Sequence, residues 1–295
     1  MSKRNWALVA ATLVSIIYGV TFTIAKDVMP KYVQPFGFIS MRVGGSMILF
    51  WLIAPFFSSE KIQKQDFPRI IAAAFFGVAL NMLTFFKGLS YTSPIMGAVL
   101  MVTTPMIVLV LSAILMKEKM QSRKVVGLLL GLAGTITLIL YGKSMVNAPN
   151  ASLGNLLVFI NAVSYGFYLI IVKKLMDKYN AFAFVKWIYT FGFLMVLPFG
   201  WSEFQAIDFA NLPVDIIWKI GFVVVFSTFL TYLLNLVSMR ELKPTIVAVF
   251  IYLQPLFATI FALALGKDQL TFVKIISAVL IFVGVYLVTI KVKSE

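Results

Sequence analysis

Two basic residues, Arg42 and Lys87, lie inside long apolar segments of this chain, where a charged side chain is rare. If either one faces a water-filled cavity between helices, it could attract an anionic group such as a carboxylate. The alternative is snorkelling, in which the apolar stem stays in lipid and the charge reaches the headgroups. Arg42 lies deeper in its segment than Lys87, which makes the cavity interpretation stronger for Arg42.

Uncharged polar residues recur at helical spacing in four apolar segments, so that each set lies along one face of a helix. They could line a substrate cavity, or they could bond neighbouring helices and serve packing alone. Because only some segments carry such stripes, we expect those helices to surround a central cavity. With the two cations and the polar residues beside two prolines, the candidate cavity residues are Ser15, Tyr18, Arg42, Asn81, Thr84, Lys87, Thr104, Asn161, Tyr165, Thr231, Asn235 and Gln254.

Several kinds of chemistry are excluded by residue type. The chain has no cysteine and no histidine, which rules out disulfides, thiol chemistry, histidine proton relays and the usual zinc or haem ligands. All eleven acidic residues fall in loops, at segment ends or at the terminus, so we expect no intramembrane carboxylate for proton coupling. A Ser/Lys pair remains formally open, but the sequence predicts no enzyme, no cofactor and no metal site.

The segments that position these residues are typical of an integral membrane protein. Hydrophobic residues make up 61% of the chain, charged residues 12%, and the mean hydropathy is +0.98. A spanning helix needs about 20 apolar residues, which leaves no room for a soluble domain. The sequence therefore predicts an all-α integral membrane protein with ten transmembrane helices, at about 6–25, 37–57, 70–89, 94–116, 125–142, 153–172, 181–199, 216–239, 245–265 and 272–290.

Lys and Arg concentrate in the loops on the side of the N-terminus, which places both termini in the cytoplasm by the positive-inside rule. That bias accounts for the net charge of +14, because the charges are scattered over short loops and form no nucleic-acid-binding patch. The expected partners are the lipid bilayer and a small-molecule substrate, and no nucleic acid. The expected location is the cytoplasmic membrane of a bacterium.

The chain is one half repeated twice. A shift of 150 residues places Pro105 on Pro255, and shifts of similar size align much of the remaining sequence. The predicted repeats are 1–145 and 146–295. Each contains five helices, an odd number, so the second half must enter the membrane from the opposite side as an inverted repeat. Proteins built in this way form a substrate site where the halves meet.

The two equivalent prolines lie near the middle of the fourth and ninth segments. Proline removes an amide donor and frees a carbonyl, which must then face protein or a cavity because lipid cannot hydrate it. Pro105 and Pro255 are therefore candidate hinges for alternating access. A plain packing kink is the alternative.

These features resemble the EamA branch of the drug/metabolite transporter superfamily over essentially the whole chain. The shared features are a mid-helix proline and a following acidic residue in each half, an arginine in the second helix, an aromatic-glycine pair in helices one and six, and glycines in helices five and ten. Departures from the family pattern are Asp268, Ser277 and Lys87. The resemblance implies helices one to four and six to nine around a central cavity, with five and ten packed at the periphery.

The resemblance also implies efflux or exchange of small metabolites, amino acids prominent among them. The predicted function is thus a metabolite exporter or exchanger that works by alternating access. The alternatives are a carrier of drugs, sugar phosphates or nucleotide sugars, and a membrane protein that transports nothing. A run of small residues in the fifth helix could support a homodimer: Gly127, Gly131, Ala133 and Gly134.

Overall fold

The computed structural model describes residues 2–57, 60–92, 94–141, 150–264 and 269–290. All regular structure in these residues is helical, and ten helical segments are long and apolar enough to cross a membrane, as expected from the sequence. Each half has an acidic residue after its proline-containing span, Glu118 in the first half and Asp268 in the second. The structure describes Glu118, whereas Asp268 lies outside the described residues.

The first half supplies five spans. The helices are α1 (Lys3–Val28), α2 (Pro35–Phe57), α3 (Phe67–Ala74), α4 (Leu80–Tyr91), α5 (Pro94–Met101), α6 (Thr104–Met116) and α7 (Ser122–Leu140), with a short 3-10 turn, η1, at Lys64–Asp66. Helices α3 and α4 form the third span together, joined by a π-helical segment, η2 (Phe75–Ala79). Helices α5 and α6 form the fourth span, which breaks just before Pro105.

The second half repeats this plan. Its helices are α8 (Ala151–Met176), α9 (Ala181–Gln205), α10 (Val214–Phe222), α11 (Thr231–Glu241), α12 (Pro244–Val249), α13 (Leu253–Ala264) and α14 (Phe272–Thr289). The eighth span contains a π-helical segment, η3 (Val223–Leu230), and the ninth contains a 3-10 turn, η4 (Phe250–Tyr252), just before Pro255. The departures from α-helix thus fall in equivalent spans of the two halves.

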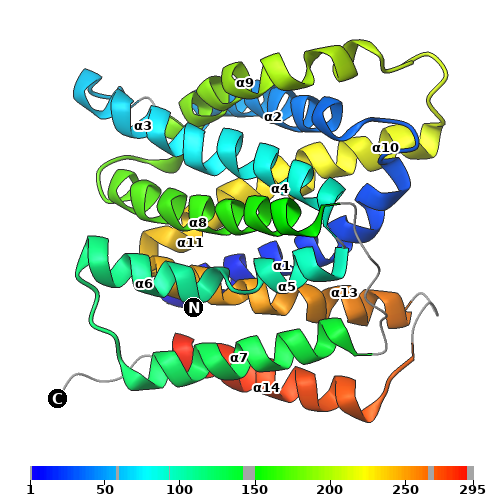
Figure 1. Cartoon of the computed structure of the whole chain (residues 1–295). Helices are drawn as coiled ribbons and strands as arrows, with labels where there is room; N and C mark the ends of the chain where they lie inside the picture. Colours follow the sequence, from blue (N-terminus) through cyan, green and yellow to red (C-terminus); the bar gives the residue numbers. More distant parts are fainter. Residues whose placement is uncertain (1, 58–59, 93, 142–149, 265–268, 291–295) are drawn as a thin grey trace.

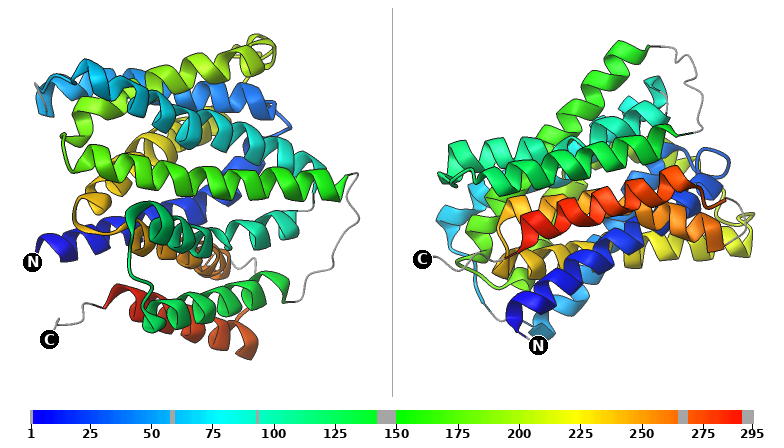
Figure 2. Two further views of the ribbon diagram at one scale, coloured as in Figure 1. Left: turned by 60° about the vertical axis from the view of Figure 1, so that its left-hand side comes forward. Right: turned by 90° about the horizontal axis from the view of Figure 1, so that it is seen from below.

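The two halves are interleaved through their first helices. Helix α1 packs against α11 and α13 of the second half, whereas α8 packs against α4 and α6 of the first half. Two further cross-half pairs, α2 with α9 and α7 with α14, lie at opposite edges of the bundle (Figure 1). Helix α1 begins and α14 ends at the same end of the bundle (Figure 2).

Glycines set the closest helix contacts. A Cβ on Gly284 would lie 2.6 Å from the Gly127 carbonyl oxygen and 2.6 Å from the Gly131 amide nitrogen, so α7 and α14 meet backbone to backbone. A Cβ on Gly134 would lie 2.8 Å from the Ser277 carbonyl oxygen of α14. The small-residue run that could support a dimer therefore packs within the chain, against α14. This pair occupies the peripheral position expected for helices five and ten.

Helices α2 and α9 are each capped by a carboxylate from the other half. Glu203, near the end of α9, accepts hydrogen bonds from the amides of Phe36 (2.6 Å) and Gly37 (2.9 Å) in the first turn of α2. At the other end of the pair, Glu60 accepts from the amide of Asn180 (2.8 Å), the residue before α9. A carboxylate at a helix N-terminus satisfies free amides and interacts favourably with the helix dipole. Each of the two helices is therefore capped by a residue from the other half.

Candidate functional site

The two halves meet in a polar group that we call the central cluster: Arg42, Tyr18, Thr228, Thr231 and Tyr232. Arg42 Nε donates a hydrogen bond to Thr228 Oγ1 at 3.1 Å, which joins α2 to the π-helical segment η3. Thr231 Oγ1 lies 3.4 Å from the Tyr18 hydroxyl of α1. Tyr232 follows Thr231 in α11 and donates to the Gly77 carbonyl of the first half at 2.8 Å. The cluster thus draws on both halves.

Three further tyrosines extend the central cluster. The Tyr189 ring lies 5.0 Å from that of Tyr232, edge to face, and the Tyr168 ring lies 6.0 Å from it. Tyr165 follows, with its ring 6.0 Å from Tyr168. The Tyr168 hydroxyl is buried without a hydrogen-bond partner in the described part of the chain. Such an unsatisfied buried group is uncommon and often marks a site that a ligand or water completes.

The π-helical segments help to build the cluster, because their geometry leaves carbonyls available to side chains. Tyr232 donates to the Gly77 carbonyl of η2 at 2.8 Å, and Thr228 donates to the Val223 carbonyl at 2.9 Å. Two other carbonyls of these segments accept from serines: Phe76 of η2 accepts from Ser164 at 2.6 Å, and Val224 of η3 accepts from Ser46 at 3.2 Å. Helices of both halves are thus tied to the two π-helical segments.

Other candidates from the sequence join helices outside the central cluster. The amides of Asn81 and Asn161 donate to each other's backbone carbonyls, at 3.3 and 2.7 Å, and so join α4 to α8. Ser15 donates to the Phe250 carbonyl at 2.8 Å and joins α1 to η4. These polar stripes hold helices together, which is the role expected of hydrogen bonds inside membrane proteins.

Thr84 and Thr104 bond within their own spans, to the carbonyls of Leu80 (2.6 Å) and Met101 (2.5 Å). Asn235 is buried on the same face of α11 as Thr231.

Lys87 differs from Arg42 in its surroundings. Its side chain is exposed, and its ammonium lies 4.9 Å from the centre of the Tyr91 ring, one turn further along α4. Arg42, in contrast, is half-buried and is hydrogen-bonded to Thr228 within the central cluster. The two cations therefore differ in their surroundings, whereas the sequence distinguished them only by their depth in the apolar segments.

Tyr189 was missed as a site residue by sequence reasoning. Tyr189 lies in α9, whose polar residues form no stripe, and nothing in the local sequence distinguishes it from the other aromatic residues of that helix. Tyr168 and Thr228 belong to the polar stripes of their segments, three residues from Tyr165 and Thr231, but they were not among the candidate cavity residues.

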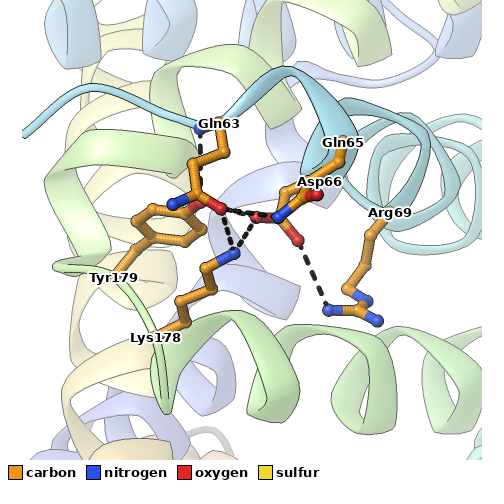
Figure 3. A network of polar contacts seen from close by, with 6 residues as sticks. All are labelled: Gln63, Gln65, Asp66, Arg69, Lys178 and Tyr179. Carbon is orange, nitrogen blue, oxygen red and sulfur yellow. Dashed lines mark hydrogen bonds and ion pairs between the residues drawn. The ribbon is translucent and has the colours of Figure 1, made fainter.

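A second polar network joins the halves at one end of the bundle (Figure 3). Asp66, at the start of the third span, accepts from Lys178 and from the Tyr179 hydroxyl (2.6 Å), and Arg69 lies 3.6 Å away. The hydrogen bond to Asp66 raises the pKa of the Lys178 ammonium above its usual value. At the opposite end of the bundle, Lys219 lies 2.9 Å from Asp27 of α1. Cross-half ion pairs therefore lie at both ends of the bundle.

The chemical groups of the central cluster determine which ligands it would suit. It contains a guanidinium, hydroxyl groups and aromatic faces, and no group of His, Cys, Asp or Glu in the described residues could hold a metal ion. A guanidinium with free N–H groups suits a carboxylate or a phosphate, and tyrosine faces suit an ammonium or an apolar group.

Comparison with known proteins places the chain among transporters. It is 26% identical to the Bacillus subtilis uncharacterized transporter YetK, with all of this chain and 90% of that protein covered. It is 25% identical to an uncharacterized transporter of Archaeoglobus fulgidus, over 98% of this chain and 99% of the other. A solved crystal structure shares the fold, with a TM-score of 0.78, 16% identity and 95% of each chain covered.

The EamA-like transporter family matches twice, over residues 5–140 and 152–290, which together make up most of the chain. The helices in these two stretches are the ones that repeat each other in the fold. The chain therefore belongs to the EamA-like transporter family and is an integral, multi-pass membrane transporter.

Proposed function

We propose that the protein exchanges or exports small metabolites that carry a carboxylate, with amino acids as the leading class, and that the central cluster binds them. One observation carries this proposal: in the described residues, Arg42 has a hydroxyl partner and no carboxylate partner. An uncompensated guanidinium inside a membrane is costly, and an anionic substrate would offset that cost during transport.

The surrounding tyrosines support an amino acid over a simple anion. Their ring faces could contact the substrate ammonium, and the Tyr168 hydroxyl could form a hydrogen bond that it lacks in this structure. A sugar phosphate or nucleotide sugar is the alternative, because a phosphate also suits the Arg42 guanidinium.

We further propose that binding alternates between the two sides through movement of the inverted halves, with the backbone breaks before Pro105 and Pro255 as hinges. Substrate or counter-substrate gradients would drive transport. The described spans place no carboxylate in the central cluster that could couple transport to protons. Uptake driven by a pH gradient alone, in vesicles without a substrate gradient, would contradict this part of the proposal. Pro105→Ala should slow exchange without weakening substrate binding.

Both termini are proposed to lie in the cytoplasm of a bacterium, as the distribution of Lys and Arg favours. Because the chain contains no cysteine, single-cysteine variants allow labelling without background. An impermeant thiol reagent added to intact cells should label Asn211→Cys and should leave Lys64→Cys unlabelled. The reverse pattern would invert the orientation.

The substrate proposal is tested by counterflow in proteoliposomes loaded with amino acids, sugar phosphates or neutral metabolites. Arg42→Gln should lower exchange by about tenfold to a hundredfold, the loss expected for a hydrogen bond to a charged group, and Arg42→Lys should retain part of it. Lys87→Gln is the matched control, because it removes a cation that lies apart from the central cluster. Full activity of Arg42→Gln would refute the anion anchor, and exchange confined to phosphorylated compounds would favour the alternative substrate class.

A further inference from the structure

A basic cavity lies apart from the central cluster, at the end of the bundle where α1 begins and α14 ends. Its volume is about 380 Å³, and it opens between the start of α1, the start of α7, the end of α14 and the junction of α11 with α12. Four cations line it, Arg4, Arg123, Lys124 and Lys243, against one carboxylate, Glu241. This excess of positive charge would repel most cations and attract an anion.

The two arginines are held in place by backbone carbonyls. Arg4 donates to the Thr289 carbonyl, and Arg123 donates to the Ile290 carbonyl at 2.9 Å, both at the C-terminal end of α14. These contacts satisfy carbonyls that a helix end leaves free. Arg123 Nε is buried and has no hydrogen-bond partner in the described residues. Each guanidinium has five N–H donors, so both arginines can take a further acceptor.

The lysines differ in how far they are neutralised. Lys124 is buried and forms an ion pair with Glu118, which also accepts a hydrogen bond from Thr245 at 3.2 Å. Lys243 Nζ lies 3.8 Å from Glu118, and its side chain is 62% exposed. Glu118 is therefore committed chiefly to Lys124, and the Lys243 ammonium is left accessible at the mouth of the cavity.

Capping of α14 is the simplest explanation for these arginines, but it accounts for only part of the arrangement. It explains the contacts with Thr289 and Ile290. It does not explain the unpartnered Arg123 Nε, the accessible Lys243 or the open volume between them.

We propose that this cavity binds a phosphate group, with Arg4, Arg123 and Lys243 as its ligands. Arginine matches phosphate oxygens with paired N–H donors, and lysine adds a point charge. Basic pockets between membrane helices are suited to anionic headgroups, and the apolar Ile246 and Val288 in the lining suit the start of a lipid tail. The phosphate could belong to a phospholipid or be free in solution, and the experiment separates the two sources.

The test uses the full-length protein, purified in a neutral detergent and depleted of lipid. Native mass spectrometry and thermal melting are recorded with phosphatidylglycerol, with zwitterionic phosphatidylcholine, and with inorganic phosphate. The variants are Arg123→Gln and Lys243→Gln, with Lys64→Gln as a control that removes an exposed lysine elsewhere. Lys243 is exposed, so its substitution leaves the fold intact even if Arg123→Gln proves unstable.

Phosphatidylglycerol should bind more tightly than phosphatidylcholine, and each pocket variant should weaken its binding about fivefold, whereas Lys64→Gln should not. Binding of inorganic phosphate with the same loss in the variants would identify a free phosphate ligand. Equal binding of both lipids with no effect of phosphate, or variants that bind like Lys64→Gln, would overturn the proposal. These measurements report ligand binding and thermal stability, so their outcome does not depend on whether the protein transports the proposed substrate.

Discussion

The contact between α7 and α14 gives a sharp test of how the helices pack. In Gly284→Ala the added methyl would lie 2.6 Å from the Gly127 carbonyl oxygen and from the Gly131 amide nitrogen, whereas ordinary contact begins at 3.4 Å. Both neighbours are backbone atoms and cannot rotate away, so the helices must separate by about 0.8 Å, a gap that forfeits about a quarter to a half of each dispersion contact.

We expect this separation to cost about 1–3 kcal/mol, the usual penalty for overpacking a close interface. Helix association in a membrane depends on such packing, so little else offsets the loss. The apparent Tm should fall by about 2–4 °C for each kcal/mol. The assay is thermal unfolding of the detergent-solubilised protein, followed by fluorescence of its five tryptophans.

Gly221→Ala is the matched control, because a Cβ at Gly221 would meet nothing within 4 Å. Alanine is also the better helix former, by about 1 kcal/mol in soluble helices, so this variant should be as stable as the wild type or more stable. Equal melting temperatures for the two alanine variants would refute the packing argument. A loss in Gly284→Ala that varied with protein concentration would mean that the contact is made between chains.

Two further predictions concern buried polar contacts and use the same melting assay. Glu118→Gln should cost about 3–5 kcal/mol, because it leaves Lys124 buried without its ion-pair partner, and a loss below about 1 kcal/mol would contradict the buried pair. Tyr232→Phe should cost about 1 kcal/mol, because the Gly77 carbonyl loses its donor, whereas Tyr168→Phe should leave stability unchanged, since that hydroxyl has no partner to lose. Equal losses in the two phenylalanine variants would show that the hydroxyl contacts do not decide their stability.

The fold could be predicted from sequence because its main causes are local. Runs of about 20 apolar residues define the spans, and the repeat sets their inverted arrangement. The predicted ends of the spans were less accurate. Helix α1 continues to Val28, beyond the expected 6–25, and α9 continues to Gln205, beyond the expected 181–199. Apolar runs mark the hydrocarbon core, but a helix continues through the interface wherever its amides remain bonded.

The central cluster was only partly predictable. Arg42, Tyr18 and Thr231 were found because their type or spacing is unusual in an apolar helix. Tyr189 was not, because it joins the cluster only through the packing of α9 against other spans. The π-helical segments also escaped prediction, and their carbonyls accept hydrogen bonds from distant residues such as Ser46.

The mutual capping of α2 and α9 has a consequence for folding. Glu203 supplies the acceptor for the first turn of α2, and Glu60 supplies the acceptor for Asn180 before α9. A five-helix fragment of either half would retain one helix whose end lacks its acceptor. Since the two contacts lie at opposite ends of one helix pair, separate fragments could restore both only by inserting in opposite orientations. Pairing of α2 with α9 is therefore a step between oppositely inserted halves, and it can be completed only after Glu203 has been synthesised.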